Sequence, residues 1–280
     1  NRGAQIRDWQ GGSIVHTAFG SAAEQRETVE LLDRLGSYLL DYEQRLSALV
    51  AEEQYTQTLR TRSGTPAERV LLSDYVLVRL PGGLAWLGFR DTFLVDGQPV
   101  RHRDSRLERL FRDGDADAVE RARRLVDDSA RYNLGDDLIH RTINGPTVTL
   151  DLLHPRYRTR FSFRLRGQDN IDGRRLSKID FEERQRPPII KTPAGDDQVT
   201  RGTAWVDPVS GAVLKTYLNV VISETSQAKL TVSFRPNQDF GFLVPSEMKE
   251  VYRGPFATIF GVAKYANFRQ FQTSARIIEQ

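Results

Sequence analysis

The sequence contains no cysteine in its 280 residues, which excludes disulfide bonds, thiolate catalysis, cysteine-based zinc sites and a lipidated cysteine within it. Such cross-links are not needed, because a chain of this length buries roughly three quarters of the surface that its unfolded form exposes. With 39% hydrophobic and 28% charged residues, the composition is that of a globular protein. We therefore expect one folded domain with its own core.

Long apolar runs are also missing. The longest, residues 212–222, is interrupted by Lys215 and Asn219, whereas about 18 consecutive apolar residues are needed to span a bilayer. No transmembrane segment is expected. Residue 1 is Asn and no signal peptide precedes it, which fits a cleaved export precursor and equally a trimmed sequence.

The charges of the two signs nearly cancel. Lys and Arg number 40 and Asp and Glu number 37, which gives a net charge of +3. Only six of the cationic residues are lysine, and so strong an arginine bias is typical of a GC-rich genome rather than of a phosphate-binding surface. A nucleic-acid partner is therefore not implied.

Signatures of catalysis and metal binding are absent as well. The histidines lie far apart and form no pair at the spacing of a zinc site. They are His16, His102, His140 and His154. There is no Gly-x-Ser-x-Gly elbow, no Walker-type glycine loop and no His-Glu-x-x-His motif. Acidic doublets such as Glu182-Glu183 would place their carboxylates on opposite faces of a strand. We expect no enzyme, no metal and no other cofactor.

Residues 24–50 carry the clearest helical pattern. Apolar residues recur there at spacings of three and four, which places them on one face of a helix. They are Leu32, Leu35, Leu39, Tyr42, Leu46 and Leu49. The stripe covers barely three heptads and a sheet pattern follows, which favours packing against that sheet over a coiled coil. Residues 1–22 are rich in Gly, Ser and Ala, and we interpret them as a flexible or partner-docking arm.

After the helix the hydrophobic pattern changes to period two, which is typical of strands. Turn signals such as Pro81-Gly82-Gly83 and Asp96-Gly97 separate the strands. No helix pattern interrupts them after residue 160, so the sheet must be antiparallel. Residues 105–132 are predicted to form a helical insertion that covers an end or a face of the sheet. The predicted strands span residues 51–61, 69–80, 84–95, 157–166, 174–183, 202–206, 212–223, 227–235, 240–252 and 258–268.

The strand predicted over residues 157–166 alternates most sharply, with an apolar side and a basic side. Several guanidinium groups on one strand could bind phosphate, lipid headgroups or an acidic protein. The alternative is a solvated face that Glu182 and Glu183 of the next strand neutralise. The candidate residues for this anionic-partner surface are Arg158, Arg160, Arg164 and Arg166.

Apolar residues of other predicted strands extend the apolar side of the strand predicted over residues 157–166. Together they are either the lining of a ligand cavity or an ordinary core. The candidates for a ligand-binding lining are Trp205, Phe161, Phe163, Ile179, Phe181, Val232 and Phe234.

The C-terminal part carries recognisable motifs. Residues 202–211 read Gly-Thr-Ala-Trp-Val-Asp-Pro-Val-Ser-Gly and are followed by Leu214-Lys215. Residues 243–248 read Leu-Val-Pro-Ser-Glu-Met, and residues 261–265 read Gly-Val-Ala-Lys-Tyr. This region resembles the C-terminal strands of outer-membrane lipoprotein-sorting proteins, the family of the periplasmic lipoprotein carrier, and resembles proteins that acidobacteria encode with the same terminal pattern. The match covers residues 200–270 well and residues 24–60 loosely.

The resemblance implies an α+β fold, a curved and incompletely closed antiparallel β-barrel, or half-barrel, packed on a long N-terminal helix. We expect residues 23–280 to form this single domain, with the helical insertion at about 105–132. In this family the greasy concave face holds acyl chains, so the resemblance implies a non-catalytic protein, periplasmic or extracellular, that shelters an acyl chain or another apolar ligand. The alternative is a structural or assembly subunit of an envelope complex that docks through residues 1–22.

Overall fold

The computed structural model describes residues 16–17, 21–46, 49–78, 87–100, 124, 130–135, 137–139, 141, 143–191 and 198–270. The helices within this part are α1 (Ala22–Arg45), α4 (Val148–Leu153) and the 3₁₀ helix η1 (Pro155–Arg160). The strands are β1 (His16–Thr17), β2 (Leu49–Thr61), β3 (Ala67–Val78), β4 (Leu87–Val95), β5 (Gln98–Pro99), β6 (Phe161–Ile171), β7 (Arg174–Glu183), β8 (Val199–Val206), β9 (Val213–Val221), β10 (Gln227–Asn237), β11 (Phe242–Arg253) and β12 (Ala257–Gln270).

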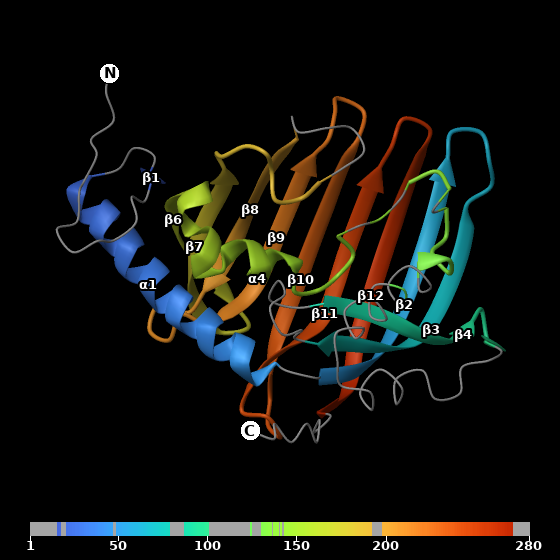
Figure 1. Ribbon diagram of the computed structural model, residues 1–280, viewed down its shortest axis with the longest axis horizontal. Coiled ribbons are helices and arrows are strands. Elements are labelled where there is room, and N and C mark those ends of the chain that lie inside the picture. Colours follow the sequence, from blue (N-terminus) through green and yellow to red (C-terminus); the bar gives the residue numbers. More distant parts are fainter. Residues whose placement is uncertain are drawn as a thin grey trace, which may run out of the picture.

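All of these strands belong to one sheet in the order β1-β6-β7-β8-β9-β10-β11-β12-β2-β3-β4-β5. Neighbouring strands run antiparallel, apart from the short β1, which pairs in parallel with β6. Different strands form the two edges, so the described sheet is open, and it twists until its β3–β4 end crosses the direction of the middle strands (Figure 1). The expected half-barrel is confirmed.

Helix α1 starts at a capping box. The Ser21 hydroxyl accepts from the Glu24 N–H at 3.3 Å, and the Glu24 carboxylate accepts from the Ser21 N–H at 2.7 Å. The helix ends at Arg45, and Leu49 is already the first residue of β2. The prediction of a helix over 24–50 is therefore too long at its C-terminal end. Leu49 continues the three-residue spacing by chance, and its burial comes from the sheet.

Helices α1 and α4 lie on the same face of the sheet, and they cross over β6 to β10 (Figure 1). Alternate residues of the strands turn to this face and are buried, as in β10, where Ala228, Leu230, Val232 and Phe234 are buried. The leucine stripe of α1 packs on them in one hydrophobic cluster. The predicted packing of the helix on the sheet is thus confirmed.

The segment before β6 differs from the prediction. Residues 155–160 form η1 instead of the first half of a strand, because Pro155 stands at its first turn and the His154 side chain accepts from the Arg156 N–H. Upstream, β1 pairs with Ser162 and Phe163, so part of the predicted arm 1–22 lies along the sheet edge. The predicted insertion 105–132 falls outside the described residues apart from Arg124 and residues 130–132.

Candidate ligand-binding site

Six of the seven predicted lining residues lie on the helix-covered face of the sheet. They are between 0 and 6% exposed, and the rings of Phe161 and Phe181 meet edge to face with their centroids 5.8 Å apart. We call these six residues the apolar face: Phe161, Phe163, Ile179, Phe181, Val232 and Phe234.

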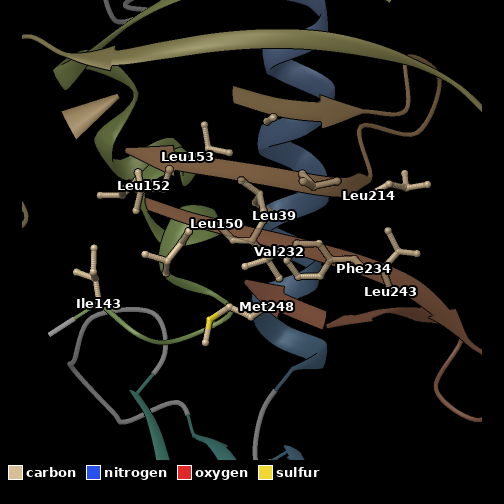
Figure 2. Packing of buried hydrophobic residues seen from close by; sticks show 14 of the residues in the cluster. Leu39, Ile143, Leu150, Leu152, Leu153, Leu214, Val232, Phe234, Leu243 and Met248 are labelled. Atoms are coloured by element: carbon tan, nitrogen blue, oxygen red, sulfur yellow. The ribbon is translucent and has the colours of Figure 1, made fainter. Parts of the chain in front are cut away.

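Side chains from outside the sheet cover the apolar face. Leu150, Leu152 and Leu153 of α4 are at most 5% exposed, and Leu39 of α1 is fully buried. Figure 2 shows Leu39 and Leu150 beside Val232, with Phe234, Leu243 and Met248 in the same cluster. We call residues 148–160, which comprise α4 and η1, the cover segment. Its apolar underside closes the apolar face together with α1.

Polar contacts at the rim attach the cover segment to α1. The Arg156 side chain donates to Glu43 at 3.1 Å and to Nδ1 of His154 at 2.9 Å. Because Nδ1 accepts these hydrogen bonds, the proton of a neutral His154 ring lies on Nε2, which donates to Glu43 at 3.1 Å. A further ion pair joins Arg158 to Asp33 at 2.5 Å. The cover segment is therefore held by hydrophobic contacts on its underside and by charge-assisted hydrogen bonds at its edge.

The cover segment also contains an acidic residue, Asp151 of α4. Burial raises the pKa of Asp151 well above its usual value; the Arg156 charge opposes this shift and the Glu43 charge adds to it. One oxygen of this carboxyl is buried without a hydrogen-bond partner in the described chain. Protonated Asp151 therefore suits this position better than its charged form.

Trp205 does not belong to the apolar face. It pairs in register with Lys178 and Lys215, whereas Ile179 pairs with Ala204, so Trp205 points to the outer face of the sheet. There its ring N–H donates to Asp169 at 2.7 Å, and the amino group of Lys215 lies 5.0 Å from the ring centroid. The prediction grouped Trp205 with the other apolar residues because of its hydrophobicity alone. The pairing register between the strands places it on the opposite face.

The four arginines predicted to share one strand face are divided between two elements. Arg158 and Arg160 stand on η1, where Arg158 pairs with Asp33 and Arg160 with Glu183 at 3.1 Å. Arg164 and Arg166 stand on β6 and line a cleft on the outer face. The prediction failed for Arg158 and Arg160 because the strand begins only at Phe161.

Sequence reasoning missed a buried polar cluster at the other end of the inner face. The Arg90 guanidinium donates to both carboxylate oxygens of Glu53, at 2.6 and 2.9 Å, and these side chains are 5% and 0% exposed. Beside them, fully buried Arg141 lies 3.5 Å from Glu250. Burial raises the pKa of Glu250, and Arg141 and the Tyr55 hydroxyl oppose the shift. The only sign of this cluster in the sequence is the alternating series on β2 of Ala51, Glu53, Tyr55, Gln57 and Leu59.

No protein-family model matches the chain, and no curated protein matches it by sequence. Solved structures do. A DUF1329 family protein from Desulfovibrio piger is similar at a TM-score of 0.40 and 12% identity, over 91% of this chain and 95% of that chain. A domain assigned to the outer membrane lipoprotein-sorting proteins, from Vibrio parahaemolyticus, follows at 0.37 and 12%, over 86% and 94%.

A LolA superfamily protein from Nitrosomonas europaea is similar at a TM-score of 0.34 and 9% identity, over 88% of this chain and 97% of that chain. The name of the Vibrio parahaemolyticus structure mentions lipoprotein sorting, the family that the C-terminal motifs resemble. At such identities and TM-scores, the likeness carries no information about what this chain binds.

Two further findings concern the described residues alone. No cluster of three or more His, Cys, Asp or Glu side chains there is arranged to hold a metal ion. No helix in that part of the chain is both long and apolar enough to cross a membrane. His102 and His140 lie outside it.

Proposed function

We propose that the protein is a non-catalytic, extracytoplasmic binding protein that shelters an acyl chain between the apolar face and the cover segment. One observation carries the proposal. The apolar face is closed by leucines of α1 and α4, two helices that lie outside the sheet and that can separate from it without breaking a strand pair.

The chemistry of the closure favours an apolar ligand. Hydrophobic contacts are non-directional, so an acyl chain can take the place of Leu150, Leu152 and Leu153 against the same strands. Each buried methylene group contributes about 0.8 kcal/mol, which lets a long acyl chain compete with these three side chains.

The cover segment is suited to give way. Helix α4 has six residues and no side-chain hydrogen bond at its N-cap Thr147, and a helix this short is unstable by itself. Its position therefore depends on its leucine contacts and on the rim contacts of Glu43, His154 and Arg156. An extracytoplasmic setting is supported by the C-terminal motifs of residues 202–211 and 243–248.

A reversible lock on the cover segment tests the proposal. A Cβ atom at Gly36 of α1 would lie 4.0 Å from Cβ of Pro155, within the range of about 3.5–4.5 Å for a disulfide. The chain has no cysteine, so Gly36→Cys with Pro155→Cys creates a single cross-link. We expect the reduced double variant to bind a fluorescent long-chain fatty acid as the unchanged protein does, and the oxidised form to lose this binding.

The two single variants, treated with the same oxidant, control for the loss of Gly36 and Pro155. Native mass spectrometry of the unchanged protein, loaded with a fatty acid or a triacylated peptide, should give one ligand per chain. Binding that is equal in oxidised and reduced protein, or a protein that takes up neither ligand, contradicts the proposal.

A further inference from the structure

The buried polar cluster adjoins the apolar face on the inner side of the sheet. Val232 of the apolar face pairs with Met248 of β11, and Glu250, two residues further along β11, turns to the same side. The chain segment that carries Arg141 shows the same transition, since Ile143 belongs to the same hydrophobic cluster as Met248 (Figure 2). A ligand whose hydrocarbon tail lies on the apolar face can therefore place its other end among polar groups, about 7 Å from Met248 along the strand.

The hydrogen bonds within the cluster fix which atoms donate and which accept. The Oε1 atom of Gln57 accepts from the Leu134 N–H and from Arg141, each at 2.8 Å, so the other end of this amide is its NH₂ donor. The Tyr55 hydroxyl accepts from Arg141 at 3.0 Å and donates to Oε1 of Glu250. The remaining atoms of these side chains can therefore be assigned as donors or acceptors.

Four polar atoms of the cluster have no hydrogen-bond partner in the part of the chain that the structure describes, although their residues are at most 4% exposed. They are Nε2 of Gln57, Nε of Arg141, Oε2 of Glu250 and the hydroxyl of Tyr252. Glu250 and Gln57 flank Gly261, which has no side chain to separate them. Burial and then the Glu250 charge raise the pKa of Tyr252, and Arg141 opposes the shift, so this hydroxyl lies near both groups. Buried polar atoms without partners are destabilising, and a ligand that supplies the partners removes this penalty.

The charges of the cluster balance each other. Arg90 pairs with Glu53, and Arg141 lies beside Glu250. A charged ligand group would add a buried charge that these four side chains leave uncompensated, which is strongly unfavourable. Of the unpartnered atoms, Nε2 of Gln57 and Nε of Arg141 donate, and Oε2 of Glu250 accepts. The complementary ligand group is therefore uncharged and has both an acceptor and a donor.

We propose that this cluster binds the uncharged polar end of an amphipathic ligand, such as a fatty amide or a monoacylglycerol, whose acyl chain lies on the apolar face. The inference rests on the proposed function and names its class of ligand. An oxygen of the polar end accepts from Gln57 and Arg141, and an N–H or O–H next to it donates to Glu250. The Tyr252 hydroxyl completes the site as a donor or an acceptor.

The test removes only the Tyr252 hydroxyl and compares two ligands of equal chain length, monolauroylglycerol and dodecane. Each displaces a fluorescent fatty acid from the full chain, and the affinity of the fluorescent acid is measured for every variant. Tyr252→Phe should weaken the binding of monolauroylglycerol about fivefold, the loss expected for one hydrogen bond, and leave that of dodecane unchanged. Without ligand its melting temperature should equal or exceed that of the unchanged protein, because the hydroxyl has no partner in the described chain.

The matched control is Thr200→Val. Thr200 lies on the same face in β8, three strands from β11, and its buried hydroxyl likewise has no partner among the described residues. This variant should bind both ligands as the unchanged protein does. Binding of both ligands that Tyr252→Phe leaves unchanged or weakens equally, an equal effect of Thr200→Val, or a lower melting temperature of Tyr252→Phe overturns this inference alone. A chain that binds neither ligand overturns the proposed function with it.

Discussion

Gly211 shows at the scale of one residue how the C-terminal motif positions the helix. It ends the turn between β8 and β9 at φ +75°, and an added Cβ would collide with the backbone of α1 at Arg34. The turn is held by Asp207, whose carboxylate accepts from the N–H groups of Val209 and Ser210, each at 2.9 Å. Partial burial would raise the pKa of Asp207, but these hydrogen bonds outweigh it and the pKa lies below its usual value.

Replacing Gly211→Ala should destabilise the protein by more than the positive φ alone requires, because α1 must also move. Gly173→Ala is the matched control, since Gly173 has φ +76° and nothing within 4 Å of an added Cβ. The control should cost about 1 kcal/mol, and Gly211→Ala about 2 to 4 kcal/mol. Urea unfolding of both variants measures this, and equal losses would show that α1 does not press on the turn.

The buried pair of Arg90 and Glu53 makes a second prediction at this scale. Glu53→Gln and Arg90→Met should each cost about 3 to 5 kcal/mol, because each leaves the other group buried without its partner. The double variant should cost clearly less than the sum. Asp41→Asn, at an exposed ion pair with Arg45, should cost about 0.5 kcal/mol or less. Additive losses in denaturant unfolding would contradict a coupled pair.

The position of an individual side chain was harder to predict than the strand that carries it. The burial of Phe161, Phe163 and Val232 follows from alternation within a strand, which the sequence displays. The outward position of Trp205 depends on the register between β8 and its neighbours, which no local pattern records. For the same reason the burial of Glu53 and Arg90 was not visible, since their compensation comes from contact between distant segments.

At the scale of elements, the cover segment should respond to pH through Asp151. The charged and titratable groups that interact with Asp151 are Glu43 of α1, Arg156 of η1 and Tyr75 of β3. Its pKa is raised on folding, so the folded state gains stability from protonated Asp151 below the unfolded pKa of about 3.9. That gain is lost as the pH rises through the folded value.

Asp151→Asn, which stays neutral, should remove this part of the pH dependence. The melting temperatures of the variant and the unchanged protein should agree best near pH 4 and diverge as the pH rises, with the variant higher. Thermal scans of both proteins between pH 4 and 8 test this. A variant curve parallel to that of the unchanged protein would exclude Asp151 as the titrating group.

Most elements could be predicted, and the exceptions share a cause. Strands β7, β10 and β12 lie within a few residues of their predicted limits because their alternation is long and regular. Helix α4 has six residues and η1 is a 3₁₀ turn, so neither offers enough sequence for a periodic pattern. The cover segment, which closes the apolar face together with α1, could therefore not be predicted from the sequence.

The place of β12 has a consequence for how the chain reaches its structure. In the described sheet it lies between β11 and β2, where Ala263 pairs with Tyr55 across more than two thirds of the sequence. Pairings between such distant segments form slowly, because a long loop must close first. The hairpin of β2 and β3 and the later meander that ends in β11 therefore stay separate until β12 pairs with both of them. During most of synthesis, the edge of β2 to which β12 later pairs has no partner strand.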